Sequence, residues 1–185
     1  MVTASTVSGI DPRDIISVFA QNGFCKTSME DIAQAVGLSR QSIYKKFGSK
    51  EACYNWSLKT YMTNVYTRVF AILEEMDGPP QDILERVFDA VVGDGVDLAK
   101  TPHGVKLVED SLEVAASQKE NWPECYRIRL SEFLLRSGFA SSPEQGQDIA
   151  HLLVTASRGA LVVASSRQDF SEDMRRIIKT VLSGA

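Results

Sequence analysis

The sequence predicts an all-α fold of about nine helices. Apolar residues recur at helical spacing along the chain, and no segment shows the alternation typical of a β-strand. Residues that start helices (Ser, Asp and Pro) and residues that stop them (Gly and Pro) divide the chain into segments of helical length. The 185 residues are 44% hydrophobic, which is enough for packed cores and too much for a disordered chain.

Short helices are expected within the first fifty residues. Asp11-Pro12 suits the start of the first helix, and Gly23 suits its end. Either Thr27 or Ser28 caps the second helix, and Ser39 caps the third. Apolar residues on one face of each helix indicate that the three share a small core.

The second and third of these helices have the pattern of a helix-turn-helix. Ala33 is small enough to let the next helix approach, and Gly37 can adopt the positive φ that ends a helix. Ile43 anchors the third helix from inside.

The same stretch is a basic segment in an acidic chain. Arg40, Lys45, Lys46 and Lys50 follow one another with no Asp or Glu between them. Residues 1–60 hold seven Lys or Arg against five Asp or Glu, whereas the whole chain has a formal net charge of −4. This contrast indicates a contact with nucleic acid.

The rest of the chain is also expected to be helical. One long helix runs from about Lys50 to Met76 with no flexible linker after the basic segment, and Asp77-Gly78-Pro79-Pro80 stops it. The next helix is expected to close at Gly93-Asp94-Gly95. The remaining helices are expected at about 101–117, 122–137, 142–167 and 170–182.

Several classes of protein and site have little support. No run of eighteen apolar residues is present, so no membrane span is expected, and the N-terminus shows no secretory signal. Three widely spaced cysteines favour a reducing cytoplasm over a disulfide framework. The two histidines lie outside metal-binding spacings, so no metal and no cofactor are expected. No phosphate loop, nucleophile elbow or paired-carboxylate motif is present, so we expect neither catalytic residues nor an enzyme.

One combination of residues in the first third of the chain is highly specific. It consists of Phe19, Gly23-Phe24, Thr27-Ser28, Asp31-Ile32-Ala33, Ala35, Gly37-Leu38-Ser39, Ile43-Tyr44, Phe47 and Ser49-Lys50-Glu51. With this combination, residues 15–53 resemble the TetR family of bacterial transcriptional regulators. The resemblance implies a helix-turn-helix DNA-binding domain at residues 10–50 and a helical effector-binding and dimerisation domain at residues 51–185.

The chain departs from the family pattern at two points. The family commonly carries several basic residues before its first helix, whereas here only Arg13 is nearby. Cys53 stands where the family usually has leucine, and we expect it to pack as a small hydrophobic residue.

The chemistry of the side chains predicts which residues contact DNA. Arg40 and Gln41 are the expected base readers, since Arg pairs with guanine and Gln with adenine in the major groove. Lys46, Lys50 and Thr27 are expected to hold phosphates. The resemblance implies that the hydroxyl of Tyr44 also contacts a phosphate. The full expected set is Thr27, Ser28, Ser39, Arg40, Gln41, Ser42, Tyr44, Lys45, Lys46 and Lys50.

The resemblance also implies a small-molecule effector of unknown identity, bound in the second domain. Aromatic residues at helical spacing fit the lining of a cavity, but they fit ordinary core packing as well. The expected lining residues are Tyr66, Phe70, Phe88, His103, Trp122, Tyr126 and Phe133.

The segment 152–164 carries apolar residues on more than one face. Such a helix lies either in a central core or between its own core and a second subunit. A homodimer would place two recognition helices about 34–36 Å apart, which matches successive major grooves. The expected interface residues are Leu152, Leu153, Ala156, Gly159, Ala160, Val163, Met174, Ile178 and Val181.

The expected function is that of a cytoplasmic repressor that binds a palindromic double-stranded DNA operator as a dimer and is released by its effector. Activation rather than repression stays open. A helical protein-interaction module, whose basic helix meets an acidic partner, is one alternative. An all-α enzyme is the other.

Overall fold

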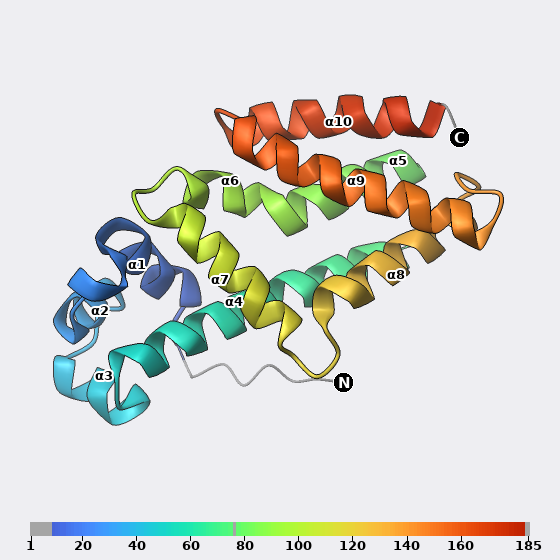
Figure 1. Cartoon of the computed structure of the whole chain (residues 1–185). Coiled ribbons are helices and arrows are strands. Elements are labelled where there is room, and N and C mark those ends of the chain that lie inside the picture. Colours follow the sequence, from blue (N-terminus) through green and yellow to red (C-terminus); the bar gives the residue numbers. More distant parts are fainter. Residues whose placement is uncertain (1–8, 76, 184–185) are drawn as a thin grey trace. The chain divides into compact units, whose positions relative to one another are not determined.

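The computed structural model describes residues 9–75 and 77–183, and every regular element in these ranges is a helix (Figure 1). The α-helices are α1 (Pro12–Lys26), α2 (Met29–Ala35), α3 (Arg40–Phe47), α4 (Lys50–Glu74), α5 (Pro80–Phe88), α6 (Asp94–Ala99), α7 (Gly104–Ala116), α8 (Trp122–Arg136), α9 (Pro143–Val163) and α10 (Arg167–Ser183). A π-helix, η1 (Asp89–Gly93), joins α5 directly to α6. The expected all-α class is confirmed.

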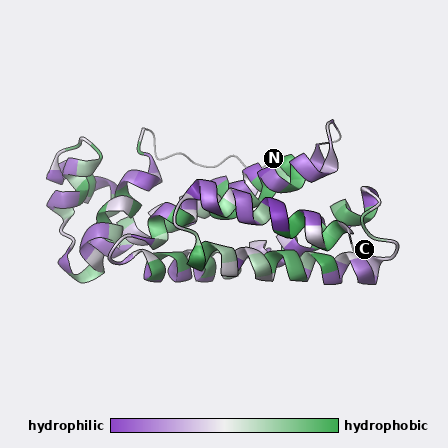
Figure 2. Cartoon of the chain, turned by 90° about the horizontal axis from the view of Figure 1, so that it is seen from above, coloured by the Kyte–Doolittle hydropathy of each residue, from purple (hydrophilic) through white to green (hydrophobic). Residues whose placement is uncertain are grey.

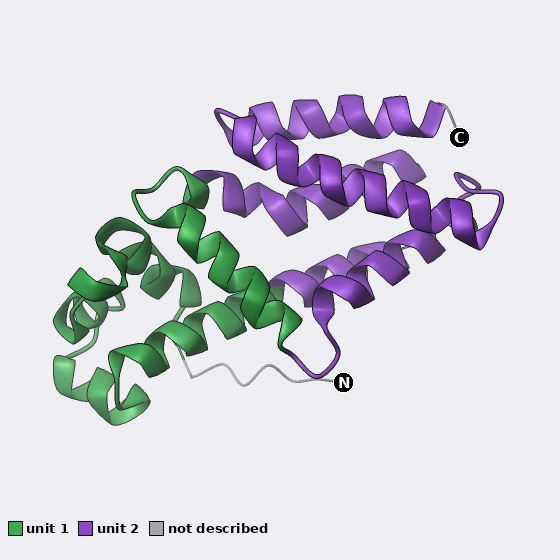
Figure 3. Cartoon of the chain, in the orientation of Figure 1, with its two compact units in different colours: residues 1–64, 98–117 green, residues 65–97, 118–185 purple. Residues whose placement is uncertain are grey.

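The chain forms two compact units (Figure 3). The N-terminal unit contains the residues up to 64 together with 98–117, and the C-terminal unit contains 65–97 and the residues from 118 onward. The long helix α4 therefore contributes its first part to one unit and its second part to the other. The N-terminal unit is larger than residues 10–50, because α7 packs against α1. The functional division at residue 50 stays a prediction.

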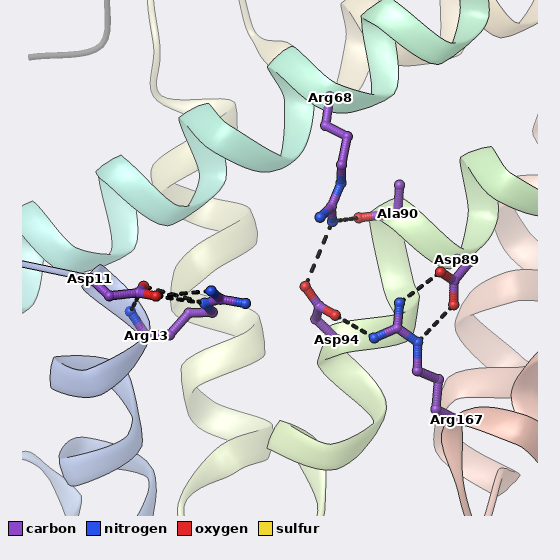
Figure 4. A network of polar contacts seen from close by, with 7 residues as sticks. All are labelled: Asp11, Arg13, Arg68, Asp89, Ala90, Asp94 and Arg167. Carbon is purple, nitrogen blue, oxygen red and sulfur yellow. Dashed lines mark hydrogen bonds and ion pairs between the residues drawn. The ribbon is translucent and has the colours of Figure 1, made fainter. Parts of the chain in front are cut away.

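The core of the N-terminal unit is built from apolar residues of five helices. Phe19, Ile32, Ile43 and Leu58 are at most 1% exposed, and Leu107 of α7 joins them. Burying each such side chain contributes roughly 1.5–3 kcal/mol, which short helices need because they are marginal alone. Asp11 caps the N-terminus of α1, and its carboxylate accepts from the Arg13 backbone N–H (Figure 4).

The C-terminal unit is a bundle in which α9 packs against α8 on one side and α10 on another. Leu84, Phe88, Leu130, Leu153 and Phe170 are fully buried in it. Hydrophilic and hydrophobic residues alternate along each ribbon, as amphipathic helices require (Figure 2).

Three expected helix ends differ from the structure. Gly23 has φ +75° and interrupts the helical backbone, but α1 continues beyond it to Lys26. Gly93-Asp94-Gly95 does not stop the helix, because η1 takes in one extra residue per turn and the chain continues into α6. The helix expected at 142–167 ends earlier, at Val163, where Ala164 turns to an extended conformation. The expected end of α4 at Met76 lies outside the described residues.

In the part of the chain that the structure describes, no helix is long and apolar enough to cross a membrane.

Candidate nucleic-acid interface

The turn between α2 and α3 is set by one small residue and one glycine. Ala33 is 1% exposed, and its carbonyl accepts from the Leu38 N–H at 2.9 Å, which closes the turn. Gly37 has φ +66°, a conformation that residues with a Cβ avoid. The expected helix-turn-helix frame is therefore present in the structure.

The N-terminus of α2 is capped by Ser28, which settles the choice between Ser28 and Thr27. The Ser28 hydroxyl accepts from the Asp31 N–H at 3.2 Å, and the Asp31 carboxylate accepts from the Ser28 N–H at 2.8 Å. The bonds that the Asp31 carboxylate accepts from the Ser28 N–H and hydroxyl lower its pKa from the ordinary 3.8. Thr27 is 3% exposed, and its hydroxyl donates to the Gly23 carbonyl at 2.8 Å. Its side chain is thus turned inward.

Helix α3 has one buried face and one exposed face. Ile43 is fully buried, and Phe47 packs on Trp56 with ring centroids 5.1 Å apart. The other side chains of α3 point to solvent and are polar. They are Arg40, Gln41, Ser42, Tyr44, Lys45 and Lys46, which we call the α3 face.

Two contacts organise the start of the α3 face. The Arg40 guanidinium lies 5.5 Å from the centroid of the Tyr44 ring, so the two side chains are neighbours on the surface. Ser39 caps α3 by accepting from the Ser42 N–H at 3.1 Å, and the two hydroxyls are 2.8 Å apart. A phosphate near this end would therefore meet hydroxyl groups and the positive pole of α3.

Lys50 is used differently from the other basic residues. Its ammonium donates to the carbonyls of Phe24 at 2.6 Å and Thr27 at 2.8 Å, and it lies 4.7 Å from the Phe24 ring centroid. These carbonyls are at the end of α1, where a positive charge is favourable. The structure thus gives Lys50 a role in fixing α1, which the sequence pattern did not reveal.

The expected effector-lining aromatics form a packed cluster in the C-terminal unit. The Tyr66 centroid lies 5.8 Å from that of Phe70, 5.9 Å from Trp122 and 6.3 Å from Tyr126. Burial raises the pKa of Tyr66 to about 12 and also raises that of Tyr126. The Tyr126 hydroxyl is buried and has no hydrogen-bond partner among the described residues.

The other three expected lining residues are not in this cluster. Phe88 and Phe133 are at most 2% exposed and belong to the packed interior. His103 is an exposed residue of the N-terminal unit. Its backbone N–H donates to the Ala20 carbonyl at 3.0 Å. The effector assignment of all seven residues stays a prediction.

A groove of about 350 Å³ lies elsewhere in the C-terminal unit, and sequence reasoning missed it. Its floor is apolar and its rim is charged. The rim residues come from α4, α5, η1 and α10, and nothing in their spacing along the chain reveals that they meet. Within residues 9–75 and 77–183, no group of three His, Cys, Asp or Glu is arranged to hold a metal ion.

The structure divides the expected interface residues into two groups. Leu153, Ala160, Met174 and Ile178 are at most 5% exposed and pack within their own chain. The exposed or half-exposed group lies mainly on α9 and consists of Leu152, Ala156, Gly159, Val163 and Val181. Leu152 is 52% exposed and Val163 is 71% exposed, which leaves apolar surface on α9 uncovered in the single chain.

Residues 15–55 match the family model described as bacterial regulatory proteins, tetR family. The chain is 28% identical over 91 residues to the uncharacterized HTH-type transcriptional regulator YezE of Bacillus subtilis (strain 168). The aligned segment covers 49% of this chain and 44% of that protein. It is 28% identical over 75 residues to the HTH-type transcriptional repressor DhaR of Mycobacterium sp. (strain GP1), covering 40% and 38%. The chain thus matches less than half the length of either relative.

The whole chain resembles solved structures of regulators. A TetR transcriptional regulator from Legionella pneumophila aligns with a TM-score of 0.64 at 16% identity, over 97% of this chain and 98% of that one. The ketosteroid transcriptional regulator KstR2 of Mycobacterium tuberculosis aligns with a TM-score of 0.61 at 18% identity, over 100% and 98%. At these identities the likeness shows the fold. The relatives and fold neighbours are transcriptional regulators, in agreement with the expectation that the chain is not an enzyme.

Proposed function

Because the chain belongs to the TetR family of bacterial transcriptional regulators, through residues 15–55 and through its fold, we propose that it represses transcription by binding a palindromic operator as a homodimer. A small-molecule effector then releases it. The single observation that supports DNA binding most strongly is the α3 face, where six exposed polar side chains, three before and three after the buried Ile43, point to solvent.

The side chains of the α3 face divide by chemistry into base readers and phosphate holders. Arg40 and Gln41 are exposed in the first turn of α3, the part of a recognition helix that reaches base edges. Lys45 and Lys46 lie in its last turn and neutralise phosphates. In this proposal Lys50 and Thr27 act indirectly, since both are bonded to α1 and hold it next to α2.

Dimerisation is supported by the uncovered apolar surface of α9. Leu152 and Val163 expose large hydrophobic side chains. A Cβ on Gly159 would meet nothing within 4 Å apart from its chain neighbours and the backbone of its own helix. A second copy of α9 would find there both apolar area and room for close approach. Two subunits give two recognition helices, which a palindromic operator requires.

Effector-dependent release is coupling between two sites, so the effector must favour one state of the protein over the other. The α4 helix is the element that both compact units share. A change at the C-terminal part of α4 therefore has a covalent route to the N-terminal unit.

Selection of bound fragments from a random duplex pool tests the proposal. We expect a palindromic consensus. Gln41→Ala should then lose roughly 1–3 kcal/mol at one base position per half-site and leave the others unchanged. Gln147→Ala, an exposed glutamine on α9, is the matched control and should behave like the unchanged protein.

The selection, together with an assay of turnover, separates the alternatives. A protein-interaction module would select no consensus and would bind an acidic protein instead of duplex DNA. An enzyme would retain turnover after loss of Arg40 and Lys46. A uniform loss of affinity from Gln41→Ala across all sequences would contradict its role as a base reader.

A further inference from the structure

The groove in the C-terminal unit combines an apolar floor with a rim of guanidinium groups. Ile72, Ala90, Phe170 and Met174 form the floor, and each of them is at most 8% exposed. The rim carries the side chains Arg68, Glu85, Arg86, Asp89, Arg167 and Arg175. A volume of about 350 Å³ is within the range of small-molecule sites, which span roughly 300–1,000 Å³.

The acidic groups of the rim are each paired with an arginine. Both oxygens of Asp89 accept from Arg167, at 2.8 and 2.6 Å, and both oxygens of Glu85 accept from Nε of Arg175, at 3.1–3.2 Å. Arg167 also donates to Asp94 at 2.7 Å, so all three of its nitrogen atoms are engaged (Figure 4). Each carboxylate on the rim thus already has an arginine as its partner.

The groups on the rim that can still bind a ligand are hydrogen-bond donors. Arg175 donates only through Nε, and within the described residues neither of its terminal nitrogens has a hydrogen-bond acceptor. One terminal nitrogen of Arg68 donates to the Ala90 carbonyl at 2.9 Å. The same nitrogen lies 3.6 Å from an Asp94 carboxylate oxygen (Figure 4). The other two nitrogens of Arg68 have no acceptor in the described part of the chain. A guanidinium fork with free N–H groups is suited to a carboxylate.

The backbone beside the groove is also unusual. The π-helix η1 forms part of the wall through Asp89 and Ala90, and such segments occur frequently at functional sites. A Cβ on Gly93 would lie 2.5 Å from Asp89 Oδ1 and 3.1 Å from Arg167 Nε. The absence of a side chain at Gly93 thus permits the ion pair that shapes this wall.

We propose that this groove binds a small organic anion, a carboxylate with an apolar body, whose charge pairs with Arg175 and Arg68 while its apolar part covers Ile72, Phe170 and Met174. This assigns a chemical class to the effector, and to that extent it rests on the function proposed above. Binding itself is measurable without DNA, so the two proposals fail separately.

The test is calorimetric titration of the full chain with hexanoate, octanoate and phenylacetate, each at up to millimolar concentration. Octylamine and octanol are the matched cationic and neutral ligands. We expect at least one carboxylate to bind and both controls to bind roughly tenfold more weakly or not at all, which corresponds to about 1.4 kcal/mol.

Three variants locate the site. Arg175→Gln should weaken carboxylate binding roughly tenfold, about 1.4 kcal/mol. Glu85→Gln should strengthen it, because the full guanidinium of Arg175 becomes available, and damage to the fold cannot mimic a gain. Arg129→Gln, which removes a surface arginine paired with Glu74 outside the groove, should leave binding unchanged.

Several results would overturn the proposal. They are the absence of binding by all three carboxylates, equal binding of octylamine, and undiminished binding to Arg175→Gln. Operator affinity is then measured with and without the bound carboxylate. Carboxylate binding that leaves operator affinity unchanged would overturn the assignment to the effector, and failure to bind any duplex would contradict only the proposed function.

Discussion

The Lys50 ammonium lies 2.8 Å from the Thr27 carbonyl oxygen, so the first residue of α4 holds the connection between α1 and α2. The same ammonium reaches the carbonyls of Phe24 and Cys25. A basic residue within a positively charged recognition segment thus has a structural task. It acts at the end of α1, where unpaired carbonyls and the helix dipole favour a cation.

We predict that Lys50→Met and Lys45→Met weaken operator binding for different reasons. Lys50→Met should lower stability by roughly 1–3 kcal/mol, because hydrogen bonds to a charged group are lost. It should leave the salt dependence of binding unchanged. Lys45→Met should preserve stability and reduce the slope of log affinity against log salt concentration by about 0.9 per phosphate contact.

The measurements are thermal unfolding and operator titration at several salt concentrations. A Lys50→Met variant that melts like the unchanged protein and flattens the salt dependence would show that Lys50 holds a phosphate after all.

Asp31→Asn should lower the melting temperature at neutral pH, because the capping box of α2 loses its charged acceptor. Hydrogen bonds from the Ser28 N–H and hydroxyl lower the pKa of Asp31 from 3.8. A carboxyl group whose pKa is depressed by folding contributes stability above its unfolded pKa, and that stability is lost as the pH falls through the folded pKa. The difference between the two proteins should therefore be constant well above pH 3.8 and shrink below it.

Melting curves from acidic to neutral pH check this prediction. Asp148→Asn, at an exposed position on α9, is the control and should melt like the unchanged protein at each pH. A difference for Asp31→Asn that persists undiminished in acid would exclude the capping bond as its cause.

Gly104→Ala should destabilise the N-terminal unit. A Cβ at this position would lie 1.7 Å from the Leu98 carbonyl oxygen and 2.5 Å from Thr101 Oγ1, and backbone atoms cannot move aside cheaply. The expected loss is roughly 1–3 kcal/mol in chemical denaturation. Gly95→Ala is the matched control, since its nearest neighbour would be the flexible Leu161 side chain at 3.9 Å. It should be neutral or stabilise by up to about 1 kcal/mol, and equal effects of the two changes would refute the steric argument.

Val163→Glu should convert the proposed dimer to monomers. Val163 is 71% exposed on α9, and a charge buried between two subunits would be costly. Operator affinity should fall with it, because a monomer engages only one half-site. Val105→Glu, at a 63% exposed position on α7, should leave the dimer intact. Sedimentation equilibrium distinguishes the outcomes, and a Val163→Glu protein that stays dimeric would place the interface elsewhere.

The sequence by itself determined the features that depend only on residues close together along the chain. The helical class, the capping of α1 by Asp11 and the glycine at the α2–α3 turn follow from spacing and from conformational preferences, which act over a few residues. The buried position of Cys53 also followed from its place in a family pattern. The thiol is fully buried and its pKa is raised by that burial to about 11, so it packs as a hydrophobic residue.

Only the tertiary structure decided which distant residues meet. Lys50 and Phe24 are 26 positions apart, and Arg167 and Asp89 are 78 apart, so no local pattern predicts either contact. The space beside Gly93 is likewise occupied by Asp89 and by the distant Arg167, which the local sequence does not reveal. The family resemblance implied an effector site, and aromatic residues at helical spacing were compatible with its lining. Spacing cannot distinguish a packed cluster from a lined cavity, because that depends on what the neighbouring helices place against these residues.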